Sequence, residues 1–289
     1  MVREIDMTDL NLNNNTIIIG AGNLGQAVAI GRGIYGEPED LEKKNYIYIY
    51  DIDKKKKNYF KNDKSIRFVE NLPDVLKKSK IVILAIKPKD YKVVCKSIKV
   101  DIKKSAIIMS LMAGIKISNL KKELFNDAKI VRVMTNINIT WNRGISFIYA
   151  NNKVNNSDKK KIDLFWSLLC LMGSVNWIKS ESGIDKFTAL TGSGPAYFIY
   201  FCECLVKVFK NFGLNDRDAN EYVQQLFEAT SDHSGQIGFT QTKKKIASKG
   251  GTTEQALKIL QASNFEKTLE KAIRQAHSKS KNILNKKNE

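Results

Sequence analysis

The chain has 289 residues, 43% of them hydrophobic, and a formal net charge of +18 at pH 7. This length allows two domains of about 150 residues each, and the absence of a signal peptide and of any apolar run of roughly 20 residues argues against a secreted or membrane protein, so we expect a soluble, cytoplasmic one. The lysines are spread along the whole sequence without a recognisable nucleic-acid module, which favours a generally basic surface over a nucleic-acid or membrane interface.

Residues 1–15 are rich in asparagine, and we expect them to form a flexible N-terminus. The four cysteines show no framework spacing, which fits a reducing compartment. With only two histidines besides, we expect no metal site.

The first predicted element is a buried strand over residues 16–19, which runs into a turn with Gly-x-Gly-x-x-Gly spacing at residues 20–25. Gly20 would allow the turn, Gly22 would let a pyrophosphate approach the backbone, and Gly25 would let the next helix pack on the strand. The phosphates would meet free N–H groups at the positive end of that helix. We predict a dinucleotide site, with a bare packing turn as the alternative. Its residues here are Gly20, Ala21, Gly22, Asn23, Leu24 and Gly25.

A second strand over residues 46–50 ends in Asp51, where a dinucleotide fold holds the adenosine ribose. A carboxylate there accepts the ribose hydroxyls of NADH and repels the 2′-phosphate of NADPH. Residues 54–57 are lysines that could bind this phosphate, but exposed lysines are flexible, and their charge is screened over about 8 Å at physiological salt. We therefore expect a preference for NADH, with NADPH still usable.

Strand and helix patterns continue to alternate up to about residue 150. The strand over residues 80–86 is apolar on both faces, which suits a central position in a parallel sheet. Further strands are predicted over residues 66–69, 106–110, 130–134 and, at an edge, 145–149, and helices from Asn71 and over residues 90–98 and 117–125. This alternation predicts a doubly wound, Rossmann-type α/β domain with its ligand at the carboxyl ends of the strands.

The strand pattern fades after a helix capped by Ser157 and a short extended tail at residues 174–177. Beyond residue 180 the apolar spacing is helical, over residues 184–214, 216–236 and 254–284. We predict a dinucleotide-binding domain over residues 16–179 and an all-helical domain for dimerisation and substrate binding over residues 180–289.

Two glycine-containing stretches interrupt the helical third, at residues 188–197 and 246–254. The first is either a kink or a close approach of backbone, helix or ligand. The second opens a helix and carries the hydroxyls of Ser248, Thr252 and Thr253. Backbone N–H groups and hydroxyls at a helix start predict a small anion site that can take a carboxylate.

These pieces resemble the pyrroline-5-carboxylate reductase family, in the family's order, from about residue 17 to about residue 281. The matching motifs are Ile-Gly-Ala-Gly-Asn-Leu-Gly at 19–25, Ala-Ile-Lys-Pro at 85–88, Ser-x-x-Ala-Gly at 110–114, Arg-x-Met-Thr-Asn at 132–136, Thr-Gly-Ser-Gly-Pro-Ala-Tyr at 191–197 and Ser-x-Gly-Gly-Thr-Thr at 248–253. The last two, at this separation, are the most specific.

The resemblance implies an enzyme that reduces Δ1-pyrroline-5-carboxylate to proline with NADH or NADPH, the last step of proline biosynthesis. It also implies a homodimer formed through the C-terminal helices, often assembled into a larger ring. The family's further cofactor contacts fall on Ala85, Ile86, Lys87, Pro88, Ala113 and Gly114. Its substrate loop falls on Ser248, Gly250, Gly251, Thr252 and Thr253, and its substrate-proximal acid near Glu181.

Two departures from the family pattern bear on activity. The family's Met-x-Asn-Thr-Pro ends in Ile137 and Asn138 here, which removes a hydroxyl and a proline from a turn facing the cofactor. The usual proline of Ser-Pro-Gly-Gly is Lys249, which makes the loop more flexible and adds a cation beside the carboxylate pocket. Reduced or altered activity would follow from either.

The chemistry asks little of the side chains, because the nicotinamide carries the hydride and the protein orients it against the imine carbon. In this scheme Thr253 is the catalytic residue, through a hydrogen bond to the ring nitrogen. One alternative is a reductase of the β-hydroxyacid dehydrogenase type, which would need an acid or base on the helical domain and would leave the Ser-x-Gly-Gly-Thr-Thr loop unexplained. The other is a degenerate cofactor-binding scaffold or sensor without activity.

Overall fold

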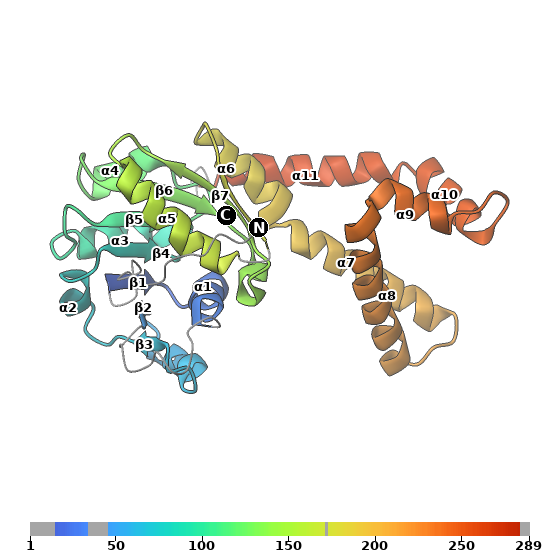
Figure 1. The fold of residues 1–289 in the computed structure, drawn as a ribbon, viewed down its shortest axis with the longest axis horizontal. Helices are drawn as coiled ribbons and strands as arrows, with labels where there is room; N and C mark the ends of the chain where they lie inside the picture. Colours follow the sequence, from blue (N-terminus) through green and yellow to red (C-terminus); the bar gives the residue numbers. More distant parts are fainter. Residues whose placement is uncertain (1–14, 34–45, 171–172, 284–289) are drawn as a thin grey trace. The chain divides into compact units, whose positions relative to one another are not determined.

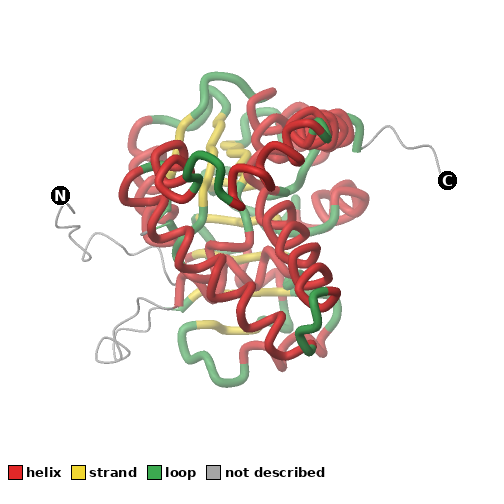
Figure 2. The backbone as a smooth tube through the Cα atoms, turned by 90° about the vertical axis from the view of Figure 1, so that its right-hand side faces the viewer, coloured by secondary structure: helices red, strands yellow, loops and turns green. Residues whose placement is uncertain are grey.

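The structure is a computed structural model that describes residues 15–33, 46–170 and 173–283. The chain divides into two compact units, Met1–Gly192 with His277–Glu289, and Ser193–Ala276. Every strand of the described residues belongs to the first unit (strands in yellow in Figure 2). The expected flexible start falls almost entirely outside the described residues, and the expected domain boundary between residues 179 and 180 stays a prediction.

The strands of the first unit form one eight-stranded sheet, in the order β3-β2-β1-β4-β5-β6-β7-β8 (Figure 1). They are β1 (Thr16–Ile19), β2 (Ile47–Tyr50), β3 (Ile66–Phe68), β4 (Ile81–Leu84), β5 (Ile107–Ser110), β6 (Lys129–Met134), β7 (Ile145–Ala150) and β8 (Ser174–Trp177). All neighbours pair in parallel except β6 with β7. The strand order reverses at β1, so the carboxyl ends of β1 and β4 flank the crevice where such sheets bind ligands.

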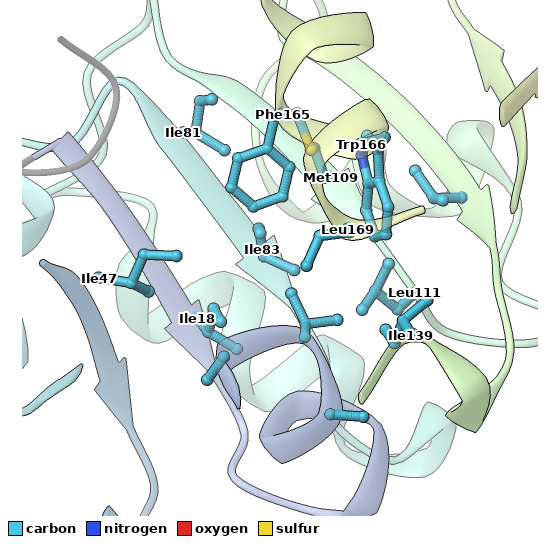
Figure 3. Packing of buried hydrophobic residues seen from close by; sticks show 14 of the residues in the cluster. Ile18, Ile47, Ile81, Ile83, Met109, Leu111, Ile139, Phe165, Trp166 and Leu169 are labelled. Atoms are coloured by element: carbon cyan, nitrogen blue, oxygen red, sulfur yellow. The ribbon is translucent and has the colours of Figure 1, made fainter. Parts of the chain in front are cut away.

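Helices cover both faces of this sheet (Figure 1). The α-helices are α1 (Asn23–Gly33), α2 (Leu72–Leu76), α3 (Tyr91–Ile98), α4 (Ile117–Glu123) and α5 (Asn156–Leu169), with 3-10 helices η4 (Lys54–Phe60), η5 (Pro88–Asp90) and η6 (Ile137–Trp141). One buried cluster lies under α1, α5 and η6 (Figure 3), and the other under α2, α3 and α4. Ile18 belongs to the first cluster and its neighbours Ile17 and Ile19 to the second, because successive strand residues point to opposite faces.

Two local expectations are corrected by the fold. The strand expected at the edge is β7, which lies inside the sheet between β6 and β8; β8, expected only as an extended tail, is the edge strand. The pairing of so short a strand depends on a distant partner and leaves little local trace in the sequence. Helix α5 is capped by Asn155 rather than Ser157: Asn155 Oδ1 accepts from the Asp158 N–H (2.9 Å), and Asp158 Oδ2 accepts from the Asn155 N–H (3.1 Å).

The chain after β8 is helical in the described residues, as the apolar spacing indicates. The elements are α6 (Ser182–Phe187), the π-helix η7 (Thr188–Gly192), α7 (Gly194–Asn211), α8 (Asp216–Ile237), α9 (Phe239–Ile246), α10 (Thr252–Ala262) and α11 (Phe265–Lys281). The π-helix accounts for the first glycine-rich interruption, and Pro195 lies in the first turn of α7. None of the helices in residues 15–33, 46–170 and 173–283 has the length and apolar character needed to cross a bilayer.

Candidate active site

Gly20 turns the chain from β1 towards α1 with a φ of 105°, which glycine adopts without strain. Its N–H donates to the Tyr50 carbonyl oxygen (2.8 Å), and a Cβ added to it would lie 2.5 Å from the Ala85 carbonyl oxygen. A Cβ on Gly25 would lie 1.9 Å from the Gly20 carbonyl oxygen. These two glycines are therefore required for α1 to pack closely on β1 and β4.

Gly22 has different surroundings, because a Cβ added to it would meet no heavy atom within 4 Å. Packing of the described residues thus does not require a glycine here, whereas the approach of a ligand to the backbone would. Asn23 begins α1 and is exposed, and Leu24 is half-buried. The first N–H groups of a helix have no acceptor within it and lie at its positive end. The turn fits a pyrophosphate, and the alternative of a bare packing turn explains Gly20 and Gly25 but not Gly22.

Asp51 follows β2 and holds the glycine-rich turn through its buried carboxylate. Its Oδ2 accepts from the Ala21 N–H (2.7 Å) and from Lys56 Nζ (2.9 Å), and its Oδ1 accepts from the Asp53 N–H (2.9 Å). Burial alone would raise the pKa of this carboxyl group, but the hydrogen bonds from Lys56 and the two backbone N–H groups outweigh it and lower the pKa below its ordinary value. Asp51 is therefore a fixed anion at the adenosine end of the expected site.

The four lysines of residues 54–57 lie on η4 and differ in their contacts. Lys54 Nζ donates to the Glu70 carbonyl oxygen (3.2 Å) and lies 4.7 Å from the centre of the Tyr50 ring. Lys57 Nζ pairs with Glu70 Oε1 at 3.1 Å. Lys56, in contrast, is half-buried on Asp51. Lys56 therefore differs from the prediction that these lysines are exposed and flexible. The sequence did not distinguish Lys56 from its three neighbours.

The segment of residues 85–88 lies next to the glycine-rich turn at the end of β4. The Ala85 N–H donates to the Ile19 carbonyl oxygen (2.8 Å), and Ile86 Cγ2 lies 3.1 Å from where a Gly20 Cβ would be. Lys87 is exposed, and Pro88 begins η5. The structure thus brings this expected cofactor segment and the glycine-rich turn together at the carboxyl ends of β1 and β4.

Ala113 and Gly114 follow β5, where small residues were expected to face a ligand. Ala113 is half-buried and Gly114 is buried. A Cβ on Gly114 would lie 2.9 Å from the Ser280 carbonyl oxygen and 2.7 Å from Ile283 Cβ. The end of α11 and the residues after it therefore occupy the space that Gly114 leaves, and a cofactor contact of Ala113 and Gly114 stays a prediction.

Glu181 lies just before α6 in a cluster of buried charges. Its Oε1 accepts from the Ile117 N–H (2.6 Å) and from an Arg132 guanidinium nitrogen (3.2 Å). The other terminal nitrogen of Arg132 donates to Asp185 Oδ1 at 3.2 Å. The sequence motifs pointed to Glu181 but not to the pairing of Arg132 with Glu181 and Asp185. An arginine inside the apolar strand β6 is nevertheless a recognisable signal, because a buried charge needs counter-charges.

The loop before α10 carries the expected substrate-binding residues. Ser248 is exposed, Thr253 is half-buried, and Thr252 is the first residue of α10. Two backbone donors of the loop are engaged within it: the Gly250 N–H donates to Glu254 Oε2 (2.7 Å), and the Gly251 N–H donates to the Ser248 carbonyl oxygen (3.0 Å). A carboxylate side chain thus occupies one of the N–H groups expected to bind the substrate carboxylate.

The turn after β6 forms without the family's hydroxyl and proline. Ile137 begins η6 and is exposed, and the Asn138 carbonyl oxygen accepts from the Arg143 N–H (3.1 Å). Asn136 Nδ2 donates to the Thr191 carbonyl oxygen (3.1 Å), which ties the turn to η7. The local geometry therefore tolerates both Ile137 and Asn138, and an exposed apolar side chain at Ile137 replaces the family's hydroxyl.

Together, the mostly parallel sheet, the open glycine turn at its switch point and the acid after β2 define a dinucleotide-binding oxidoreductase fold followed by a helical region. Residues 181–283 match the family model described as pyrroline-5-carboxylate reductase dimerisation, and residues 16–114 match NADP oxidoreductase coenzyme F420-dependent. Pyrroline-5-carboxylate reductase of Aquifex aeolicus is 32% identical over 274 residues, covering 92% of this chain and 96% of that protein. The chain belongs to the pyrroline-5-carboxylate reductase family.

Further similarities agree with this assignment. Pyrroline-5-carboxylate reductase of Pseudomonas aeruginosa is 29% identical over 264 residues, covering 91% of this chain and 94% of that protein. The crystal structure of Plasmodium falciparum pyrroline carboxylate reductase with NADP bound has a TM-score of 0.80 and 27% identity, covering 93% of this chain and 98% of that one. The expected family, the fold class and the class of enzyme, an oxidoreductase with a nicotinamide cofactor, are confirmed. The β-hydroxyacid dehydrogenase alternative does not account for the match of residues 181–283.

Proposed function

We propose that the chain reduces Δ1-pyrroline-5-carboxylate to L-proline with NADH or NADPH, the last step of proline biosynthesis. The proposal is carried by one observation: a single chain combines an open glycine turn at the sheet's switch point with a hydroxyl-rich loop at a helix start, whose Gly250 N–H donates to the carboxylate of Glu254. Family membership supports the same reaction. Purified protein should oxidise the reduced nicotinamide when given pyrroline-5-carboxylate.

The residues proposed to hold the cofactor surround the glycine-rich turn. The nicotinamide dinucleotide supplies the hydride when bound. The N–H groups at the start of α1 would bind its pyrophosphate, and Asp51 its adenosine ribose. The full set is Gly20, Ala21, Gly22, Asn23, Leu24, Gly25, Asp51, Ala85, Ile86, Lys87, Pro88, Ala113 and Gly114. The room that the described residues leave for a Cβ at Gly22 supports the fit.

The residues proposed to hold the substrate are Ser248, Gly250, Gly251, Thr252, Thr253 and Glu181. The Gly250 N–H would exchange the Glu254 carboxylate for that of the substrate, together with the N–H groups of the first turn of α10, which lack acceptors within the helix. Thr253 would hydrogen-bond the ring nitrogen. A protonated imine accepts a hydride more readily, so this contact would help to set the reactive species.

The proposed assembly is a homodimer formed through the C-terminal helices and, beyond it, a ring of dimers. The match to a dimerisation model and the exposed apolar side chains of α7 support the dimer. We place the enzyme in the cytoplasm, which agrees with free thiols at its four cysteines. The proposed domains are residues 16–179 for the dinucleotide and residues 180–289 for dimerisation and substrate.

The activity test compares two substrates with a control that contains neither. Purified protein is given NADH or NADPH with pyrroline-5-carboxylate, with the ketone of a hydroxyacid, or with neither, and absorbance of the reduced cofactor is followed. Oxidation only with pyrroline-5-carboxylate supports the proposal. Oxidation with the ketone alone would favour the hydroxyacid alternative, and cofactor binding without turnover would favour the scaffold. Higher catalytic efficiency with NADPH that persists at high salt would contradict the expected NADH preference.

A further inference from the structure

The ion pair between Asp51 and Lys56 lies directly after β2, at the adenosine end of the proposed cofactor site. Lys56 Nζ is 2.9 Å from Asp51 Oδ2, and the side chains are 27% and 9% exposed, respectively. Asp53 caps η4 by accepting from the Lys55 N–H, which sets the start of the helix that carries Lys56. Both members of the pair are therefore fixed by nearby backbone: Asp51 by the N–H groups of Ala21 and Asp53, and Lys56 by its place on the capped helix η4.

The remaining lysines of η4 are arranged differently. Lys54 and Lys57 both reach Glu70, and Lys54, Lys55 and Lys57 are exposed. Of these four lysines, Lys56 is thus the one that forms an ion pair with Asp51, the expected ribose-binding acid. An exposed lysine loses side-chain entropy when it binds and is screened by salt, whereas a half-buried one is already ordered.

The donors and acceptors of the pair are not exhausted by their mutual contact. An ammonium group has three N–H donors, of which one goes to Asp51 Oδ2. Asp51 Oδ2 accepts two hydrogen bonds and Oδ1 accepts one, from the Asp53 N–H. A carboxylate oxygen takes about two, so Oδ1 keeps a position for a ribose hydroxyl. The same pair can therefore serve a ribose with or without a 2′-phosphate.

We propose that Lys56 determines whether this chain accepts NADPH, because its ammonium bridges the Asp51 carboxylate and the 2′-phosphate. With NADH, Asp51 Oδ1 binds a ribose hydroxyl, and Lys56 keeps its hydrogen bond to Asp51 Oδ2. Without Lys56, the Asp51 carboxylate would face the phosphate uncompensated and repel it. The inference rests on the proposed function only for the identity of the cofactor.

The test measures binding without any imine substrate. NADPH and NADH are titrated into the protein by fluorescence, and 2′,5′-ADP is titrated as a competitor. Lys56→Gln should weaken NADPH and 2′,5′-ADP by about tenfold or more, because a charge-assisted hydrogen bond is lost, and should change NADH by less than about twofold, because only a partly exposed ion pair is lost. Lys56→Arg should retain NADPH. Lys55→Gln, the matched control on the same helix, should change neither cofactor.

Three results with the Lys56 and Lys55 variants would overturn the inference. One is an equal loss of both cofactors in Lys56→Gln, which would indicate a structural role. Another is unchanged NADPH binding in that variant, and the third is an equal effect of Lys55→Gln, which would indicate the general positive field. If the protein reduces the imine but Lys56→Gln binds NADPH unchanged, this inference alone is refuted. If NADPH binding depends on Lys56 but the imine is not reduced, the reductase activity alone is refuted. Failure of both cofactors to bind would refute both.

Discussion

Arg132 shows how a single residue can organise the centre of this fold. Its side chain is 1% exposed on β6 and pairs with Glu181 and Asp185, which lie at and inside the start of α6. Removing one partner of a buried ion pair leaves an uncompensated charge, which costs more than the pair itself contributes. The arginine thereby links the sheet to the segment that carries the proposed substrate-proximal acid.

We therefore expect Arg132→Met to lower the free energy of unfolding by about 3–5 kcal/mol, because the buried Asp185 carboxylate loses its counter-charge. Urea unfolding followed by circular dichroism measures the effect. Arg143→Met, at an exposed position, serves as the control and should change stability by less than about 0.5 kcal/mol. A loss in Arg132→Met no larger than in the control would show that the buried pair does not contribute.

Thr253 is the residue at which the proposed chemistry can be tested most directly. Thr253→Ala should lower kcat/KM for the imine by about 10- to 100-fold, since one hydrogen bond to a charged ring nitrogen is lost, and should leave cofactor binding nearly intact. Steady-state kinetics and cofactor titration measure the two effects. Thr240→Ala, at an exposed position on α9, should change neither. Unchanged kinetics in Thr253→Ala would remove this residue from the mechanism.

At the scale of elements, the strand-turn-helix unit of β1 and α1 contains two glycines with different tasks. Gly25 lies in contact with the Gly20 backbone, whereas no atom of the described residues would meet a Cβ added to Gly22. Close packing inside proteins leaves no room for an added methyl group at Gly25. At Gly22 an added methyl group would meet only a bound ligand. The same substitution should therefore separate folding from cofactor binding.

Gly25→Ala should destabilise the fold by about 1–3 kcal/mol or more, because the methyl group forces α1 away from β1. Gly22→Ala should unfold like the unsubstituted protein and lose cofactor affinity by about tenfold or more, because the methyl group meets the pyrophosphate. Thermal unfolding and NADH titration of both variants distinguish the two effects. Cofactor binding that survives in Gly22→Ala would favour the bare packing turn.

At the scale of the molecule, α7 requires a covering surface. The side chains of residues 198–201, Phe-Ile-Tyr-Phe, are all exposed in the single chain, and four consecutive positions point around the whole helix. A helix that is apolar all round is buried in its working state. A second copy of the chain, packed through the residues that match the dimerisation model, is the cover that we expect.

Light scattering should accordingly show a dimer or a multiple of it at micromolar concentration. Ile199→Lys should weaken the dimer by about a hundredfold or more, because a charge would be buried at the interface. Lys207→Gln, an exposed position on the same helix, should leave the assembly unchanged. A stable, active monomer of the unsubstituted protein would contradict the proposed assembly.

Sequence patterns were most reliable where structure depends on near neighbours. The apolar run and glycine spacing of residues 16–25 specify a strand, a turn and a helix within ten positions, and the two-faced burial of β4 follows from its apolar residues. The family assignment was also available from the sequence, because its motifs occur in order along most of the chain.

Tertiary structure alone decided the features that join distant residues. The edge position of β8, the contact of α11 with Gly114 and the partners of Arg132 depend on residues tens of positions away, which no local pattern encodes. The ion pair of Lys56 with Asp51 depends on how η4 is oriented about its axis. Four lysines that are alike in sequence therefore acquire different partners. Composition and periodicity determine which elements form and which face is buried, whereas the pairing of individual charges is determined only when the packed elements bring them together.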